Sequence, residues 1–189
     1  MRETSIIIAG FGGQGVLFAG QLLAYAGMAA GRNVTWIPSY GPEMRGGTAN
    51  CTVIISPEAI GSPIVSRPDI AIVLNQPSFE KYEETVKPGG LLIVNDSIVS
   101  SQTNRDDIEV VCLPANAIAE EFGTVKMMNM VVVGALLARR PILTLDVVIQ
   151  TLVEHLPAGK AHLIEANRQV LQRGYDMAHQ AAPTPEYFL

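Results

Sequence analysis

The stretch SIIIAGFGGQGVLFAGQLLAYA at residues 5–26 constrains the fold more than any other part of the chain. Ile6 to Ile8 are consecutive β-branched residues, which is typical of a strand buried on both faces of a largely parallel sheet. After a glycine cluster, apolar residues recur at helical spacing from Val16 until Gly31 ends the pattern. The stretch therefore predicts a strand, a glycine loop and a helix in direct succession.

The predicted helix carries small residues along one side, so we expect it to lie close to the sheet or to another backbone. These residues are Gly20, Ala24, Gly27 and Ala30.

The glycine loop has the spacing G-x-G-x-x-G, which lets a tight turn and a helix N-terminus face an anion. A dinucleotide site also needs an acidic residue about 20 positions further on, at the end of the second strand. Here that strand, predicted at Val34 to Ile37, is followed by Pro38, and the first acidic residue is Glu43. The pattern therefore disfavours NAD and favours close packing or partner contact by loop residues Gly10, Gly12, Gly13, Gln14 and Gly15.

The length of 189 residues predicts one α/β domain at residues 1–180 and a proline-broken tail at 181–189. Lys and Arg number 13 against 18 Asp and Glu, a formal net charge of -5 without a basic run, so nucleic acid is disfavoured as a partner. Charged residues make up only 16% of the chain, which predicts that another subunit buries part of its surface.

No stretch reaches the about 18 unbroken apolar residues of a membrane helix, and the N-terminus lacks a secretory segment, so we expect a cytoplasmic protein. Cys51 and Cys112 are predicted to be buried free thiols, because they cannot supply the four thiolates of an iron-sulfur cluster. The histidines lack metal-site spacing and are predicted to be solvated or capping residues. We predict no metal site and no catalytic residue in this chain.

The apolar segments 33–37 and 51–55 are joined by SYGPEMRGGTAN, which leaves no room for a crossover helix. These strands are therefore predicted to run antiparallel and to make the sheet mixed. Their connection is either a binding loop or a long hairpin tip, and its candidate functional residues are Tyr40, Gly41, Pro42, Glu43, Arg45, Gly46 and Gly47.

The remaining segments complete a single three-layer, Rossmann-like α/β domain with a mostly parallel, possibly mixed sheet and helices on both faces. Strands are predicted at 69–74, 91–94 and 109–113, and helices after Pro77 and Pro114 and at 126–140, 145–155 and 160–179. Asn75 and Asn95 follow two of these strands, so we expect them to line one rim with the glycine loop. The alternative is that Asn95 and Asp96 only start a turn.

Two motifs, GFGGQGV at 10–16 and SYGPEMRGGTANC at 39–51, resemble the gamma subunit of the 2-oxoacid:ferredoxin oxidoreductases. The resemblance continues through KPGGLLIVNDS at 87–97 and KMMNMVVVGALL at 126–137 and is stronger to the 2-oxoglutarate and branched-chain 2-oxoacid types. It implies an enzyme that oxidatively decarboxylates a 2-oxoacid with coenzyme A to acyl-CoA, carbon dioxide and reduced ferredoxin.

The resemblance implies that alpha, beta and ferredoxin-like delta subunits accompany this chain, and that thiamine diphosphate, Mg²⁺ and the iron-sulfur cluster belong to them. It also implies that the glycine loop and the Tyr40 to Gly47 loop face the alpha and beta subunits near the substrate or coenzyme A entrance. Two other functions stay open from the residues alone: a stand-alone NAD-dependent oxidoreductase and a nucleotide-responsive interaction module.

Overall fold

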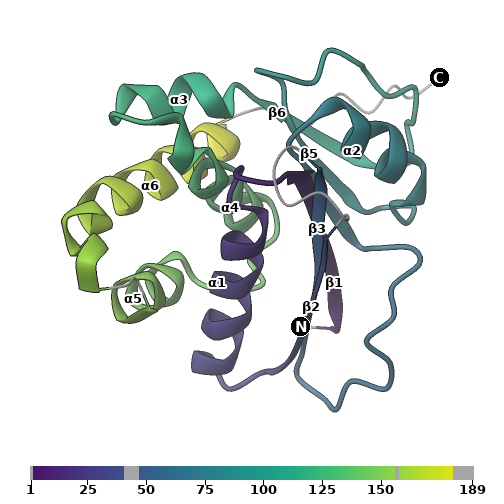
Figure 1. Ribbon diagram of the computed structural model, residues 1–189. Helices are drawn as coiled ribbons and strands as arrows, with labels where there is room; N and C mark the ends of the chain where they lie inside the picture. The colour runs from purple at the N-terminus through teal and green to yellow at the C-terminus, as the bar shows by residue number, and fades with distance from the viewer. Residues whose placement is uncertain (1, 41–46, 156–157, 181–189) are drawn as a thin grey trace.

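The computed structural model describes residues 2–40, 47–155 and 158–180 (Figure 1). A six-stranded sheet in the order β2-β3-β1-β4-β5-β6 forms its centre. The strands are β1 (Thr4–Phe11), β2 (Asn33–Tyr40), β3 (Thr48–Ser56), β4 (Ile70–Val73), β5 (Leu91–Asn95) and β6 (Glu109–Leu113). The helices are α1 (Val16–Ala29), α2 (Gln76–Tyr82), α3 (Ala115–Glu121), α4 (Met128–Arg139), α5 (Leu145–His155) and α6 (Ile164–Gln180), with short 3-10 turns before α4 and α6.

The sheet is mixed, as the short connection between the second and third strands predicts. β3 runs antiparallel to both of its neighbours, β2 and β1, whereas β1, β4, β5 and β6 are parallel. Parallel neighbours need a crossover, and the segments after β1, β4 and β5 are long enough to provide one. The carboxyl ends of the parallel strands consequently meet at one edge of the sheet.

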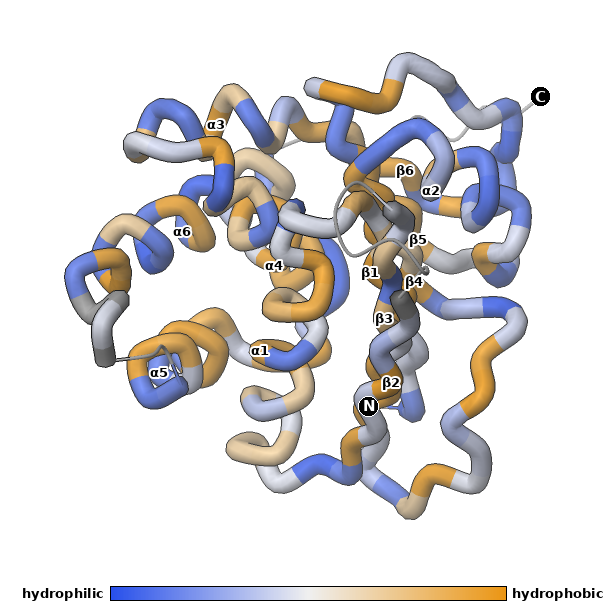
Figure 2. The backbone as a smooth tube through the Cα atoms, viewed as in Figure 1, coloured by the Kyte–Doolittle hydropathy of each residue, from blue (hydrophilic) through white to orange (hydrophobic). Residues whose placement is uncertain are grey.

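Two apolar cores hold the three layers together, which confirms the predicted architecture. The larger core joins one face of the sheet to α1, α3, α4, α5 and α6, and the smaller core joins the other face to α2 and its flanking segments. Figure 2 shows hydrophobic colour along the strands and much of α4. In β1, Ile6 and Ile8 enter the larger core and Ile7 enters the smaller one, so this strand is buried on both faces.

The close approach predicted for α1 is confirmed at two of its glycines. A Cβ atom on Gly20 would lie 2.3 Å from Cys51 Sγ, and one on Gly27 would lie 2.8 Å from Val34 Cγ2. Both distances are shorter than van der Waals contact, so only glycine lets the helix rest on β2 and β3. Ala30, by contrast, is exposed, because it lies beyond the last turn of the helix.

The two cysteines differ in their surroundings. Cys51 is fully buried, and burial raises the pKa of its thiol to about 12. The prediction of burial is wrong for Cys112, which is exposed on the edge strand β6. Cys51 is therefore an inert packing residue, as expected.

Helices α4 and α6 pack backbone to backbone through two glycines. A Cβ atom on Gly134 would lie 2.0 Å from the carbonyl oxygen of Leu171, and one on Gly174 would lie 2.1 Å from that of Val131. Every residue of α4 from Met128 to Leu137 is buried, which confirms the prediction of a helix enclosed on most of its circumference. The two helices cannot approach this closely with any larger residue at either position.

We predict that Gly134→Ala and Gly174→Ala each lower the free energy of unfolding by about 3 kcal/mol or more, because the new methyl group meets backbone that cannot rotate away. Urea denaturation measures the change. Gly61→Ala is the matched control, since a Cβ atom there meets nothing within 4 Å, and it should change stability by less than about 0.5 kcal/mol. Equal stability of all three variants would contradict the packing.

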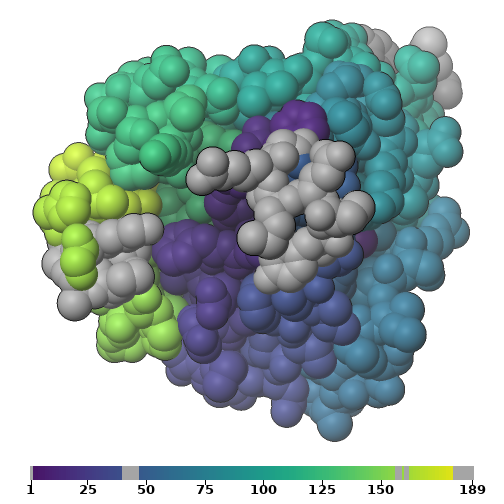
Figure 3. Space-filling model, viewed as in Figure 1, coloured from purple at the N-terminus to yellow at the C-terminus, as the bar shows by residue number. Residues whose placement is uncertain are grey.

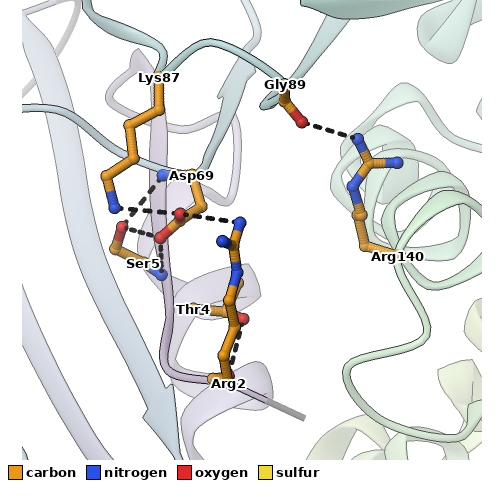
Figure 4. A network of polar contacts seen from close by, with 7 residues as sticks. All are labelled: Arg2, Thr4, Ser5, Asp69, Lys87, Gly89 and Arg140. Carbon is orange, nitrogen blue, oxygen red and sulfur yellow. Dashed lines mark hydrogen bonds and ion pairs between the residues drawn. The ribbon is translucent and has the colours of Figure 1, made fainter.

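Asp69 ties the amino ends of β1 and β4 together (Figure 4). Its Oδ2 accepts hydrogen bonds from the Ser5 amide at 2.9 Å and the Ser5 hydroxyl at 2.6 Å, and Lys87 Nζ lies 3.0 Å from Oδ1. Burial of the carboxylate opposes ionisation, but these hydrogen bonds and the lysine charge outweigh it and lower the pKa of Asp69 below 3.8. Arg2 is too exposed to add much to this network.

Because the pKa of Asp69 is lower in the folded state, its contribution to stability is present above the ordinary value of 3.8 and is lost as the pH falls through the folded-state value. We expect Asp69→Asn to lower the free energy of unfolding by about 1–3 kcal/mol at neutral pH, and the deficit to shrink in acid. Urea titrations at several pH values measure it, with the exposed Asp106→Asn as control. A deficit that does not change with pH would exclude this role.

Candidate functional site

The two sequence motifs lie side by side at the carboxyl edge of the sheet. The antiparallel pairing of β1 with β3 places Phe11 opposite Thr48, and the Gly12 amide donates a hydrogen bond to the Gly47 carbonyl at 2.9 Å. Tyr40 ends β2 opposite Ala49. The predicted residues Gly41, Pro42, Glu43, Arg45 and Gly46 lie outside the described residues, so the structure places the ends of this loop and not its interior.

Gln14 fills the centre of the glycine loop with its own side chain. Its Oε1 accepts a hydrogen bond from the Phe11 amide at 2.6 Å, and its Nε2 donates to the Leu74 carbonyl at 3.1 Å. A Cβ atom on Gly10 would lie 2.6 Å from that same Oε1, so Gly10 provides the room for the Gln14 carboxamide. The loop therefore satisfies part of its own backbone where a dinucleotide-binding loop would leave amides free.

The position of Gln14 coincides with the crevice where open α/β sheets bind ligands. β1 and β4 are parallel neighbours whose following helices, α1 and α2, cover opposite faces of the sheet. Such a change of side opens a crevice beyond the carboxyl ends of the two strands. Gln14 bridges these ends, and Asn75 Nδ2 lies 3.5 Å from its Oε1.

Gly15 and Asn129 join the glycine loop to the helical layer. Gly15 has a φ of 73°, a left-handed conformation that glycine adopts without strain. Its carbonyl accepts a hydrogen bond from Asn129 Nδ2 at 3.1 Å, and a Cβ atom on Gly15 would lie 2.4 Å from that nitrogen. Asn129 therefore connects the start of α4 to the glycine loop.

The polar residues after β4 and β5 lie at the same edge, but they also serve local structure. Asn75 caps α2 by accepting a hydrogen bond from the Ser78 amide at 2.9 Å, and the Asn95 carbonyl accepts one from the Val99 amide at 3.0 Å in a turn. Asn95 Nδ2 donates to Asn116 Oδ1 at 3.0 Å. Asn116 was not expected here, because it is the second residue of α3 and only the fold brings it to Asn95.

The described residues contain no group of three or more His, Cys, Asp or Glu side chains that could hold a metal ion. His155 stacks on Tyr25 and His179 on Tyr175. No helix in the described part of the chain is long and apolar enough to cross a bilayer. The assignment of catalysis and metal binding to other chains stays a prediction.

These features define a Rossmann-like α/β domain whose glycine loop is closed by its own glutamine. The model of the pyruvate ferredoxin/flavodoxin oxidoreductase family matches residues 5–177, so the chain belongs to this family. The resemblance carried by the GFGGQGV and SYGPEMRGGTANC motifs is thereby confirmed.

Curated relatives include the ketoisovalerate oxidoreductase subunit VorA of Methanothermobacter marburgensis, 36% identical over 95% of this chain and 37% of that protein. The 2-oxoglutarate synthase subunit KorC of Methanocaldococcus jannaschii is 33% identical over 95% of this chain and 96% of that protein. The chain thus spans only about 37% of the length of the first of these relatives and nearly all of the second.

Among solved structures, the keto/oxoacid ferredoxin oxidoreductase gamma subunit of Geobacter sulfurreducens superposes with a TM-score of 0.81 at 27% identity. The match covers 94% of this chain and 99% of that subunit. The predicted fold class and the similarity to gamma subunits are therefore both confirmed.

We predict that Gln14→Ala speeds hydrogen exchange at the Phe11 amide and lowers the free energy of unfolding by about 1–2 kcal/mol, because two hydrogen bonds that close the loop are lost. Amide exchange followed by NMR and urea denaturation are the measurements. Gln169→Ala is the control, since that glutamine makes only an exposed hydrogen bond to Glu165. Unchanged exchange at Phe11 would show that Gln14 does not hold the loop.

Proposed function

We propose that this chain is the gamma subunit of a 2-oxoacid:ferredoxin oxidoreductase. The assembled enzyme would decarboxylate a 2-oxoacid, transfer the acyl group to coenzyme A and pass the electrons to ferredoxin. The proposal is supported by the similarity to a 2-oxoglutarate synthase subunit and a ketoisovalerate oxidoreductase subunit. These relatives make 2-oxoglutarate or a branched-chain 2-oxoacid the proposed substrate.

In this proposal the chain is a partner of the catalytic subunits. Thiamine diphosphate, Mg²⁺ and the iron-sulfur cluster are assigned to the alpha, beta and delta chains, and coenzyme A is a co-substrate of the complex. The two cysteines of this chain support the assignment, because Cys51 lies inside the core with a raised pKa and Cys112 lies on the edge strand. A four-thiolate cluster cannot be built from them.

One observation carries the proposed role of the rim: the hydrogen bond from Gly12 to Gly47 joins the two family motifs. Gly12 and Gly13 are exposed at this point, whereas Asn75 is fully buried and the Gln14 carboxamide is hydrogen-bonded between the ends of β1 and β4. A glycine loop whose inner side is occupied by its own side chain and whose outer side is exposed is better suited to contact another subunit than to bury a dinucleotide. We therefore propose that the glycine loop and residues 40–47 face the alpha and beta subunits near the substrate or coenzyme A entrance.

The stand-alone NAD-dependent enzyme is the weaker alternative. β2 ends in Ser39 and Tyr40, without an acid to hold ribose hydroxyls, and the Phe11 amide is already bonded to Gln14. Calorimetric titration of NADH into the purified chain distinguishes the two functions, because micromolar binding would favour the dehydrogenase. A nucleotide-responsive module would instead bind adenine nucleotides with an affinity that alpha and beta subunits do not alter.

Arg45 is the most informative residue of the second loop, because its guanidinium can hold a carboxylate or phosphate at two points. We expect Arg45→Ala in the assembled complex to lower acyl-CoA formation at least about 10-fold, to raise the Michaelis constant for coenzyme A or the 2-oxoacid, or to prevent assembly. Steady-state kinetics and co-purification with tagged alpha and beta subunits are the measurements.

Arg168→Ala is the control, because Arg168 pairs with Glu165 on the exposed face of α6. An ion pair of that kind contributes at most about 1 kcal/mol. If both variants assemble and turn over like the unaltered complex, residues 40–47 are structural and the proposed role of the rim is wrong.

A further inference from the structure

A pocket lies between α1 and α5, on the side of α1 that faces away from the sheet. Figure 3 shows these helices adjacent on the visible face, with α1 in purple and α5 in green. The volume of the pocket is about 150 Å³. Its walls are formed by Phe18, Gln21, Leu22, Tyr25, Leu152 and His155.

The pocket has the size and the walls of a site for one aromatic ring. Leu22 and Leu152 are 3% and 1% exposed, so its floor belongs to the main core, and Phe18, Tyr25 and His155 add three planar side chains. An engineered apolar cavity of about 150 Å³ is known to bind benzene. Planar side chains favour planar ligands because offset stacking and edge contacts become available.

Two polar groups distinguish this pocket from an apolar cavity. Tyr25 and His155 stack with ring centres 4.2 Å apart and an angle of 20° between their planes. His155 Nδ1 lies 3.0 Å from the Thr151 carbonyl, which can only accept, so in the neutral ring the proton is on Nδ1 and Nε2 is an acceptor. Tyr25 Oη accepts a hydrogen bond from Gln21 Nε2 at 3.2 Å and keeps its own proton for donation.

A phenolic hydroxyl matches the hydrogen-bonding roles of these two groups, because it can donate to an imidazole Nε2 and accept from a tyrosine hydroxyl. We propose that the pocket between α1 and α5 is a binding site for a free small phenolic molecule. The site is separate from the glycine rim, which lies beyond the amino end of α1, and its occupancy does not depend on the proposed enzymatic function.

The test is titration of phenol and of benzene into the full chain in mildly alkaline buffer, followed by NMR of the Leu22 and Leu152 methyl groups. Phenol should shift both residues and bind about 3- to 10-fold more tightly than benzene, the gain expected from one or two neutral hydrogen bonds. A purely apolar pocket gives the opposite order, because the phenol hydroxyl would lose its water without a replacement.

His155→Phe and Tyr25→Phe keep the stacked rings but remove one polar group each. Each change should reduce the preference for phenol, and the two changes together should abolish it, because each removes one hydrogen-bonding group. Benzene binding should stay within about 2-fold of the unaltered chain, because the stacked rings are kept. Val153→Ala is the matched control on the same helix, since Val153 is 47% exposed and does not line the pocket.

Three results would overturn the proposal: no shift at Leu22 or Leu152 with either compound, tighter binding of benzene than of phenol, or a phenol preference that survives both ring exchanges. The same titration on the chain co-purified with its partner subunits separates a free ligand from a buried contact. If phenol binds the free chain but not the complex, a partner covers the pocket and the assignment to a free molecule is wrong.

Discussion

The pairing of β1 on both of its edges is the interaction on which the rest of the structure depends. β1 is bonded to β3 on one side and to β4 on the other, and Ile6, Ile7 and Ile8 are at most 6% exposed. The partner strands determine which segments meet at the glycine loop where β1 ends. β3 delivers Gly47 and β4 delivers Leu74 and Asn75. The composition of the rim thus follows from strand order and not from proximity in sequence.

Local patterns predict the parts of this arrangement that depend on neighbouring residues. The run of isoleucines, the glycine spacing and the short connection from β2 to β3 correctly predict the first strand, the turn and the mixed sheet. Contacts over long sequence separations could not be predicted in the same way. Gln14 bonds to a residue 60 positions away, and Asn129 to one 114 positions away, and nothing in their local sequence specifies these partners. Exposure of Cys112 was missed for a related reason: Val111 and Leu113 of the edge strand β6 pack into the larger core, and Cys112 between them lies on the opposite face, where it is not covered.

The packing of the helices is a second feature that local sequence patterns predict only in part. The apolar run at 126–140 predicts a buried helix, and α4 is buried, but the sequence does not state which element encloses it. The close contact with α6 depends on Gly134 and Gly174, each of which admits a carbonyl of the opposite helix. A glycine within a helix usually destabilises it by about 1 kcal/mol relative to alanine. Here the tight packing of α4 against α6 offsets that cost. This packing becomes evident only when both glycines are seen in the folded structure.

The glycine loop shows that the G-x-G-x-x-G spacing alone does not determine function. The side chains between the glycines must also be considered. Gly10, Gly12 and Gly15 give the chain the turn of a dinucleotide site, but Gln14 occupies the crevice between β1 and β4 and bonds the Phe11 amide. A diphosphate would have to displace the Gln14 carboxamide and leave the Leu74 carbonyl without its partner, at the desolvation cost of a buried polar group. Gly10 makes room for the Gln14 carboxamide instead of a cofactor, and the pairing of β1 with β3 brings Gly47 to the Gly12 amide. The loop spacing is therefore compatible with two functions, and the residue at position 14 favours a surface shaped for another protein.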